Sequence, residues 1–165
     1  GGGMTAVAER DLVAVGRQLG RPARDVIAVA ARCACGRPTV VTTRPRLADG
    51  TPFPTFYYLT HPAATAAASR LEAAGRMADY QAMLTGEVAA AYRAAHLAYL
   101  ADREAQGVVP ELADVSAGGM PERVKCLHAL VAHALAAGPG VNPIGDLALA
   151  DCDWSPEVCA CAADD

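Results

Sequence analysis

Apolar residues in the first part of the chain change their spacing, and the change separates one predicted helix from three predicted strands. Between residues 5 and 20 they recur every three or four positions, which favours a helix that ends near Gly20. Residues 26–33, 39–43 and 55–60 are instead short apolar or β-branched runs, typical of strands. The segment 36–38 (Gly-Arg-Pro) has the residue types typical of a turn. The third strand is preceded by a connection rich in proline and glycine, residues 45–54.

The second half of the chain has helical periodicity almost throughout. Helices are predicted over residues 62–74, 77–84, 86–105, 121–137 and 144–151, and Gly75, Gly107 and Gly138 follow three of them as terminating glycines do. We therefore expect an α+β fold, a small antiparallel sheet of about three strands packed against an alanine-rich bundle of five to six helices. Residues 4–151 are interpreted as a single globular domain, residues 1–3 as an artificial glycine extension, and residues 152–165 as a mobile tail.

Composition and charge exclude some partners. Hydrophobic residues make up 53% of the chain but aromatic residues only 5%, so alanine must supply much of the core and the helices must approach closely. The net charge is −4 and the arginines are scattered, which argues against a nucleic-acid surface. No apolar run approaches the roughly 20 residues of a bilayer span, and no export signal is visible. We expect a cytoplasmic protein without nucleic-acid or membrane partners, whose helices pack within one chain or across a homodimer.

The densest candidate chemistry lies in residues 118–128. Lys125 is the only lysine among 14 basic residues, and it stands next to the thiol of Cys126 and close to the imidazole of His128. A nearby cation stabilises a thiolate and lowers its pKa, so Cys126 is the predicted nucleophile and Lys125 its catalytic partner. The alternative is that the lysine is incidental and that Cys126 is a small buried core residue.

Cysteine and histidine also suggest a metal site. Six cysteines in a chain without an export signal are more readily free thiols or metal ligands than disulfides. A regular helix from Pro121 would point Cys126 and His128 to different sides, so further ligands are needed. Cys33 and His61 end two strands and would share one rim if those strands are neighbours. We therefore predict a zinc or iron–sulfur site made of Cys33, His61 and Cys126, with His128 as a fourth ligand. The cysteines of the tail are interpreted as incidental: Cys152, Cys159 and Cys161.

Basic and polar residues of the same segments suit a small anionic ligand. Arginine offers bidentate contacts to carboxylate or phosphate, and a stiff loop over residues 49–55 lowers the entropy cost of binding. Asp49 is the predicted general base of this loop. The alternatives are arginines that are solvated or paired with acidic residues, and a loop in which Phe53 fills the core. The predicted substrate-binding residues are Arg32, Arg44, Arg46, Thr55, Arg123 and Asn142.

A polar stripe on the helix at 86–105 has a plainer interpretation. Tyr92, His96 and Tyr99 follow each other at helical spacing. Aromatic rings with polar tips at this spacing are typical of packing against a neighbour. We expect a structural stripe rather than a catalytic pair.

Several motifs together carry a family resemblance. They are Arg32-Cys33, the segments 36–38, 49–55 and 69–72, Gly118-Gly119-Met120-Pro121, the segment 123–128, and Asn142-Pro143-Ile144-Gly145. In these the chain resembles a bacterial family, best populated in actinobacteria and known only as domain of unknown function 501. The similarity runs from about Val7 to Asp151. It implies no activity, and Cys35 and the cysteines of the tail lie outside its pattern.

Three functions stay open at this level. The first is an enzyme with a cysteine- and histidine-centred site, dependent on a metal or a thiolate, that hydrolyses a small anionic substrate or transfers a group from it. The second is a non-catalytic module that binds a small molecule or a protein. The third is a chain in which zinc only joins the sheet to a helix. Replacing Lys125 with arginine should abolish an enzymatic function but affect a binding module only mildly.

Overall fold

The structure, a computed structural model, describes residues 7–159 and 161, so the predicted glycine extension lies outside the described residues. It has the predicted α+β architecture, with a three-stranded sheet, six α-helices in the described part and two short 3₁₀ helices that the periodicity did not predict. None of the described helices combines the length and the apolar character needed to cross a membrane. In chain order the elements are α1 (Glu9–Leu19), β1 (Val26–Arg32), β2 (Pro38–Thr43), β3 (Tyr57–Leu59), α2 (Pro62–Ala73), α3 (Arg76–Ala82), α4 (Gly86–Glu104), η1 (Pro110–Leu112), α5 (Leu127–Ala137), α6 (Pro143–Asp151) and η2 (Pro156–Val158).

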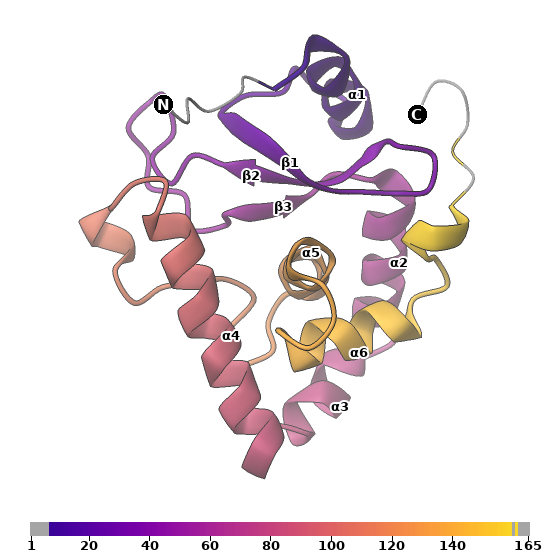
Figure 1. Cartoon of the computed structure of the whole chain (residues 1–165). Helices are drawn as coiled ribbons and strands as arrows, with labels where there is room; N and C mark the ends of the chain where they lie inside the picture. Colours follow the sequence, from indigo (N-terminus) through magenta and orange to yellow (C-terminus); the bar gives the residue numbers. More distant parts are fainter. Residues whose placement is uncertain (1–6, 160, 162–165) are drawn as a thin grey trace.

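The sheet is antiparallel in the order β1-β2-β3, so β2 is its central strand. Val41 of β2 pairs with Val29 on one side and with Tyr58 on the other. Figure 1 shows α1 on one face of the sheet and α5 on the opposite face, with α2, α4 and α6 around α5. Because both faces are covered, β2 is buried along nearly its whole length, which explains its uninterrupted apolar and β-branched sequence.

Helix α5 is the centre of the core. Leu127, Leu130 and Val131 are fully buried, and α5 packs against β3 and α6. Gly145 of α6 makes the second contact possible, since a Cβ atom there would lie 2.3 Å from the carbonyl oxygen of Leu130. Alanine-rich helices with a glycine at the crossing can approach in this way, as the composition predicted.

The stripe on α4 is confirmed as packing. Tyr92 and Tyr99 are fully buried and His96 is nearly so. The Tyr99 hydroxyl accepts hydrogen bonds from the backbone N–H groups of Phe56 and Tyr57, at 2.7 and 3.2 Å. The third strand was expected to begin at residue 55. The N–H group of Phe56 is instead bonded to the Tyr99 hydroxyl, and β3 starts only at Tyr57.

The predicted helix start at Pro121 is wrong, because α5 begins at Leu127. The residues before it form a loop in which the carbonyl of Gly118 accepts hydrogen bonds from the backbone N–H groups of Lys125 and Cys126, at 2.8 and 3.3 Å. The apolar spacing in residues 121–126 resembled a helical turn, but the loop achieves the same burial with different backbone hydrogen bonds. This later start decides the geometry of Cys126.

Candidate functional site

The four predicted metal ligands fall into two separate groups. Cys33 and His61 lie with Cys159 and Cys161, a set that we call the four-residue cluster. Cys126 and His128 lie with Glu72, a set that we call the thiol cluster. Helix α2 runs between them. His61 precedes its first residue and Glu72 is eleven positions further on, about 16 Å along a helix axis. One ion cannot be shared by all four predicted ligands.

In the thiol cluster, Cys126 is the residue that precedes α5, and its backbone is extended (φ −147°, ψ 108°). The expectation that Cys126 and His128 point to different sides assumed a regular helix through both, and it is wrong because Cys126 is not helical. The ligand atoms of Cys126, His128 and Glu72 all lie within 4.8 Å of one another. The late start of α5 therefore brings the thiol and the imidazole together.

Both ring nitrogens of His128 have partners from α2. Nδ1 lies 3.2 Å from Oε2 of Glu72, and Nε2 lies 3.1 Å from the hydroxyl of Ser69. The same Glu72 oxygen accepts a hydrogen bond from the backbone N–H of Leu127 at 2.8 Å, which fixes the carboxylate at the start of α5. An imidazolium can donate to Glu72 and to Ser69 at once, so the surroundings favour the charged ring.

The electrostatics of the cluster favour a thiolate–imidazolium pair. The neighbouring imidazole of His128 lowers the pKa of Cys126 most, helped by the backbone N–H of Ala129, while burial opposes the shift. The neighbouring thiol of Cys126 raises the pKa of His128 to about 9, with Glu72 adding to the effect. From the lowered pKa of Cys126 up to about pH 9, the pair consists of a nucleophile and a proton donor. Lys125 is exposed, and the partner of the thiol is the imidazole.

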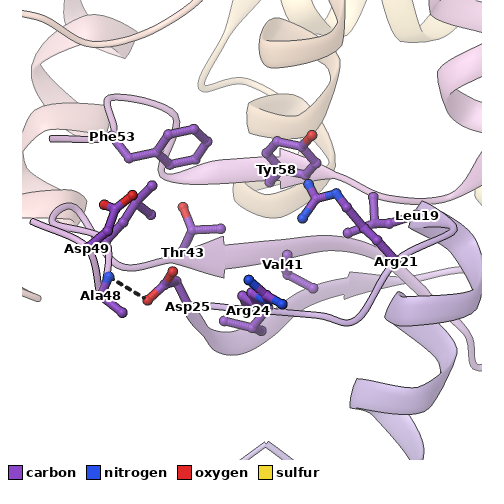
Figure 2. A pocket seen from close by; sticks show the side chains of 12 residues that line it. Leu19, Arg21, Arg24, Asp25, Val41, Thr43, Ala48, Asp49, Phe53 and Tyr58 are labelled. Carbon is purple, nitrogen blue, oxygen red and sulfur yellow. Dashed lines mark hydrogen bonds between the residues drawn. The ribbon is translucent and has the colours of Figure 1, made fainter. Parts of the chain in front are cut away.

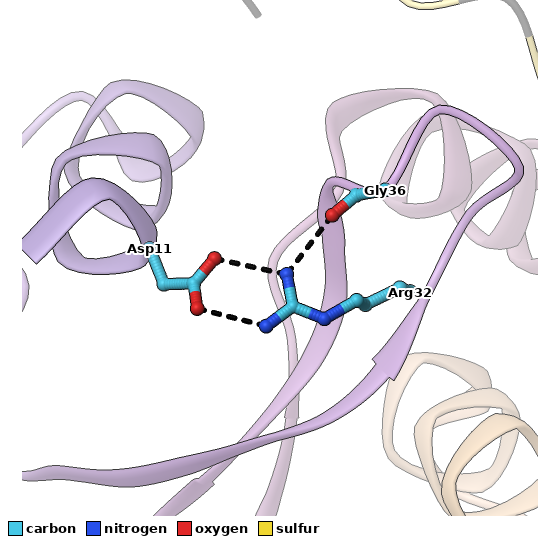
Figure 3. Close-up of polar contacts among 3 residues, drawn as sticks. All are labelled: Asp11, Arg32 and Gly36. Atoms are coloured by element: carbon cyan, nitrogen blue, oxygen red, sulfur yellow. Dashed lines mark hydrogen bonds and ion pairs between the residues drawn. The ribbon is translucent and has the colours of Figure 1, made fainter. Parts of the chain in front are cut away.

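The predicted anion-binding arginines do not converge on the thiol cluster. Arg32 forms a bidentate ion pair with Asp11 of α1, at 2.9 and 2.8 Å, and also donates to the carbonyl of Gly36 (Figure 3). Arg46 donates to Glu111 at 2.8 Å and to the carbonyl of Gly50. These two guanidinium groups hold segments of the fold together.

The other predicted ligand-binding residues are also dispersed. Arg44 and Arg123 are exposed, and the carbonyl of Thr55 accepts a hydrogen bond from the hydroxyl of Thr43 at 2.7 Å. Asn142 is fully buried, where its side-chain oxygen accepts from the backbone N–H of Gly145 at 2.9 Å. It therefore serves as the N-cap of α6.

Asp49 lines a pocket of about 310 Å³ on the sheet, shown in Figure 2. Arg21 and Arg24 also line it, and Phe53 forms part of its wall instead of filling the core. Hydrogen bonds from Thr51 lower the pKa of Asp49, and the backbone N–H of Thr51 donates to it at 2.9 Å. A raised pKa would suit a general base at neutral pH, so this carboxylate has the properties of a turn residue.

The four-residue cluster gathers soft donor atoms from three distant parts of the chain. Cys33 follows β1, His61 precedes α2, and two cysteines come from beyond α6. The Sγ atom of Cys161 lies 3.6 Å from that of Cys33 and 3.2 Å from Nε2 of His61. The Sγ atom of Cys159 lies 3.5 Å from Cys161 Sγ and 3.3 Å from His61 Nε2. These four residues could hold a metal ion such as zinc.

Sequence reasoning missed Cys159 and Cys161 because it assigned them to a mobile tail. The described part of that segment contacts the β1–β2 turn, where the backbone N–H of Ala34 donates to the carbonyl of Pro156 at 2.7 Å. Two Cys-x-Cys pairs, at 33 and 35 and at 159 and 161, were the available signal. Short cysteine spacings of this kind recur in zinc sites.

Comparison with known proteins adds a family. The model of one family matches residues 29–150, most of the chain. The chain belongs to the family described as protein of unknown function, DUF501. No curated protein and no solved structure matches the chain. The thiol cluster lies wholly inside the span matched to DUF501, whereas the four-residue cluster takes Cys159 and Cys161 from beyond it.

Proposed function

We propose that the protein is a thiol-dependent enzyme that hydrolyses a small anionic substrate or transfers a group from it, with Cys126 as its nucleophile. The observation that carries the proposal is the position of the Cys126 sulfur within 4.8 Å of the His128 imidazole, whose two nitrogens are held by Glu72 and Ser69. A nucleophile, a proton donor and a residue that orients the donor are the parts that covalent catalysis needs.

Each group has one role in this scheme. The Cys126 thiolate attacks the electrophilic carbon of the substrate and forms a covalent bond to sulfur. His128 gives its Nε2 or Nδ1 proton to the departing group, and the neutral ring then takes a proton from the water or acceptor that releases the product. Glu72 keeps the ring oriented and supports its positive charge. The exposed ammonium of Lys125, next in the chain to Cys126, supplies the attraction for an anionic substrate.

The pH dependence of thiol alkylation tests the proposal. The chain is treated with iodoacetamide between pH 5.5 and 9, and modification of each cysteine is followed by peptide mass spectrometry. Cys152 is the internal reference, because burial raises its pKa. We expect Cys126 to become reactive at a lower pH than Cys152, and we expect His128→Ala to move the profile of Cys126 to higher pH. Lys125→Arg is the matched control and should leave the profile of Cys126 unchanged.

An activated ester such as p-nitrophenyl acetate then probes the chemistry itself. A thiol enzyme of this kind gives an acetyl adduct on Cys126, and Cys126→Ala and His128→Ala both abolish it. An alkylation profile at Cys126 that follows an ordinary thiol, unchanged by His128→Ala, would refute the proposal.

A second candidate is small-molecule binding in the pocket of Figure 2. It is favoured by the side chains of Arg21 and Arg24, which line the same pocket as the aromatic rings of Phe53 and Tyr58. Thermal-shift titration with phosphate and with dicarboxylates tests it, with Arg24→Ala as the variant that should lose the shift. In this second case the cysteines serve the structure only.

A further inference from the structure

We propose that Cys33, His61, Cys159 and Cys161 bind one zinc ion, and that this ion fastens the C-terminal segment to the edge of the sheet. The proposal does not depend on the thiol-enzyme function. Three thiolates and one imidazole form a complete set of four N and S donors, which is the set typical of structural zinc. Because the protein supplies all four ligands, no position is left open for a substrate.

The distances within the cluster match a tetrahedron of the size that zinc requires. Zn–S bonds of about 2.3 Å and Zn–N bonds of about 2.0–2.1 Å place two sulfurs about 3.8 Å apart and a sulfur and a nitrogen about 3.6 Å apart. The sulfur of Cys161 lies 3.6 Å from that of Cys33 and 3.5 Å from that of Cys159, and Nε2 of His61 lies 3.2 and 3.3 Å from the sulfurs of Cys161 and Cys159. Each of these four edges is slightly shorter than in the ideal zinc tetrahedron. The donors are therefore already gathered around a common centre.

The same distances favour a single ion over the iron–sulfur cluster that the sequence also suggested. In an iron–sulfur cluster only cysteines bound to the same iron lie this close, because the bridging sulfides hold ligands of different irons further apart. Here the sulfurs of Cys33 and Cys159 both lie close to Cys161, and all four donor atoms lie within 4.8 Å of one another.

Neighbouring groups hold the ligands in place. After Cys33 the chain turns tightly, with the backbone N–H of Gly36 donating to its carbonyl at 2.8 Å. The indole N–H of Trp154 donates to the Sγ atom of Cys159 at 3.3 Å. The Sγ atom of Cys35 donates to the carbonyl of Cys159 at 3.1 Å and accepts from the backbone N–H of Cys161 at 3.3 Å. Outer partners of this kind orient the ligands of metal sites.

The protonation of His61 must change when the ion binds. Nδ1 accepts a long hydrogen bond of 3.2 Å from the backbone N–H of Ala63, which leaves the proton on Nε2. Zinc takes the lone pair of Nε2, so the proton moves to Nδ1. The protonated Nδ1 can no longer accept the hydrogen bond from the backbone N–H of Ala63. Ala63 lines a pocket of about 400 Å³ beside the cluster, where water can take over its N–H group. The three thiols release their protons to solvent as the Zn–S bonds form.

Metal analysis of the full chain, purified with a phosphine reductant and without chelator, is the first test. We expect about one zinc per chain, and cobalt substitution should give the visible absorption of a tetrahedral thiolate site. Cys161→Ser should weaken zinc binding by at least about 100-fold, because even the loss of an outer partner commonly costs 10–100-fold. Cys161 lies near the chain end, so this variant stays informative if Cys33→Ser fails to fold.

Two further variants define the ligand set. Cys152→Ser changes a free thiol outside the set and should keep one zinc per chain. Cys35→Ser changes an outer partner of Cys159 and Cys161, so it should weaken zinc binding less than Cys161→Ser does. Absence of metal, iron in place of zinc, zinc bound as tightly by Cys161→Ser as by the parent chain, or zinc lost in Cys152→Ser would each overturn the assignment. None of these outcomes changes the expected alkylation profile of Cys126, so the two proposals fail separately.

Discussion

The two clusters use the same residue types but differ in what surrounds the sulfur. In the four-residue cluster, the sulfurs and the His61 nitrogen face one another. In the thiol cluster, one sulfur faces an imidazole whose nitrogens are already held by a carboxylate and a hydroxyl. The first arrangement has a full set of metal donors. The second has one thiol, one imidazole and one carboxylate, and it lacks the additional cysteines of the first.

The contrast between His61 and His128 indicates that the hydrogen-bond partners of the histidine decide which chemistry a Cys–His pair can perform. His61 turns Nε2 toward two thiols. His128 is held by Glu72 and Ser69, and its pKa is raised to about 9 by Cys126 and Glu72, so near neutral pH the ring carries a proton. A metal centre needs neutral imidazole, whereas an activated thiol needs the charged form.

Removing the metal should give the largest effect and separate the clusters most clearly. A zinc ion in the four-residue cluster joins residues about 100 positions apart, so its removal should lower the free energy of unfolding by about 3–5 kcal/mol, by analogy with other cross-links. Guanidinium denaturation with and without a strong zinc chelator, under reducing conditions, measures this. Alkylation of Cys126 should stay within about twofold, and a parallel loss there would show that the two clusters act as one unit.

Asn142→Ala should have the next largest effect while leaving both clusters intact. It removes the N-cap of α6 and the buried hydrogen bond to Nδ1 of His133, and we expect a loss of about 2 kcal/mol in unfolding free energy. Asn142→Ser keeps a capping oxygen and should recover part of the loss. Unchanged stability in the alanine variant, with a change at Cys126, would instead favour the ligand-binding role that the sequence suggested.

Glu72→Gln tests whether the carboxylate of Glu72 supports the charged imidazole in the thiol cluster. The amide oxygen can still accept from Leu127, so the fold should lose only about 1 kcal/mol, but the imidazolium loses its negative partner. We expect alkylation of Cys126 at pH 6 to slow by about three- to tenfold. The carboxylate of Glu122, exposed and paired with Arg93, offers the matched control, and Glu122→Gln should change neither rate nor stability.

The smallest effect is expected at Arg32, outside both clusters. Its ion pair lowers the pKa of Asp11, so the stabilisation is present above the ordinary carboxyl pKa of 3.8 and is lost as the pH falls through the lowered value. Because the guanidinium is 42% exposed, Arg32→Ala should cost only about 0.5–1 kcal/mol at pH 7. Urea denaturation at pH 7 and at about pH 2.5 checks this, since the difference between variant and parent should vanish in acid. If the variant stayed equally less stable than the parent in acid, the stability lost in Arg32→Ala would come from side-chain packing and not from the ion pair.

The sequence predicted most of the fold because its signals were local. β-Branched runs marked the strands, and glycines marked helix ends such as Gly138. The start of α5 was the main error. It depends on backbone hydrogen bonds to Gly118, which apolar spacing cannot distinguish from a helical turn.

The candidate site was only partly predictable for the same reason. Cys126 and His128 share one segment, which the sequence singled out although it placed the two side chains on different sides of a helix. Cys33 and His61 were expected on one rim, and the structure does bring them together. Their cysteine partners lie 98 to 128 positions further along, and no local pattern predicts contacts over that separation.

The position of Cys159 and Cys161 also bears on how this protein should be produced. A recombinant fragment trimmed to the matched residues 29–150, or cut after Asp151, would keep Cys33 and His61 and discard the other half of the set. Such a sample would present a bare thiol at the sheet edge, open to oxidation or cross-linking between molecules. Aggregation of such a sample through Cys33 would then reflect the choice of boundary.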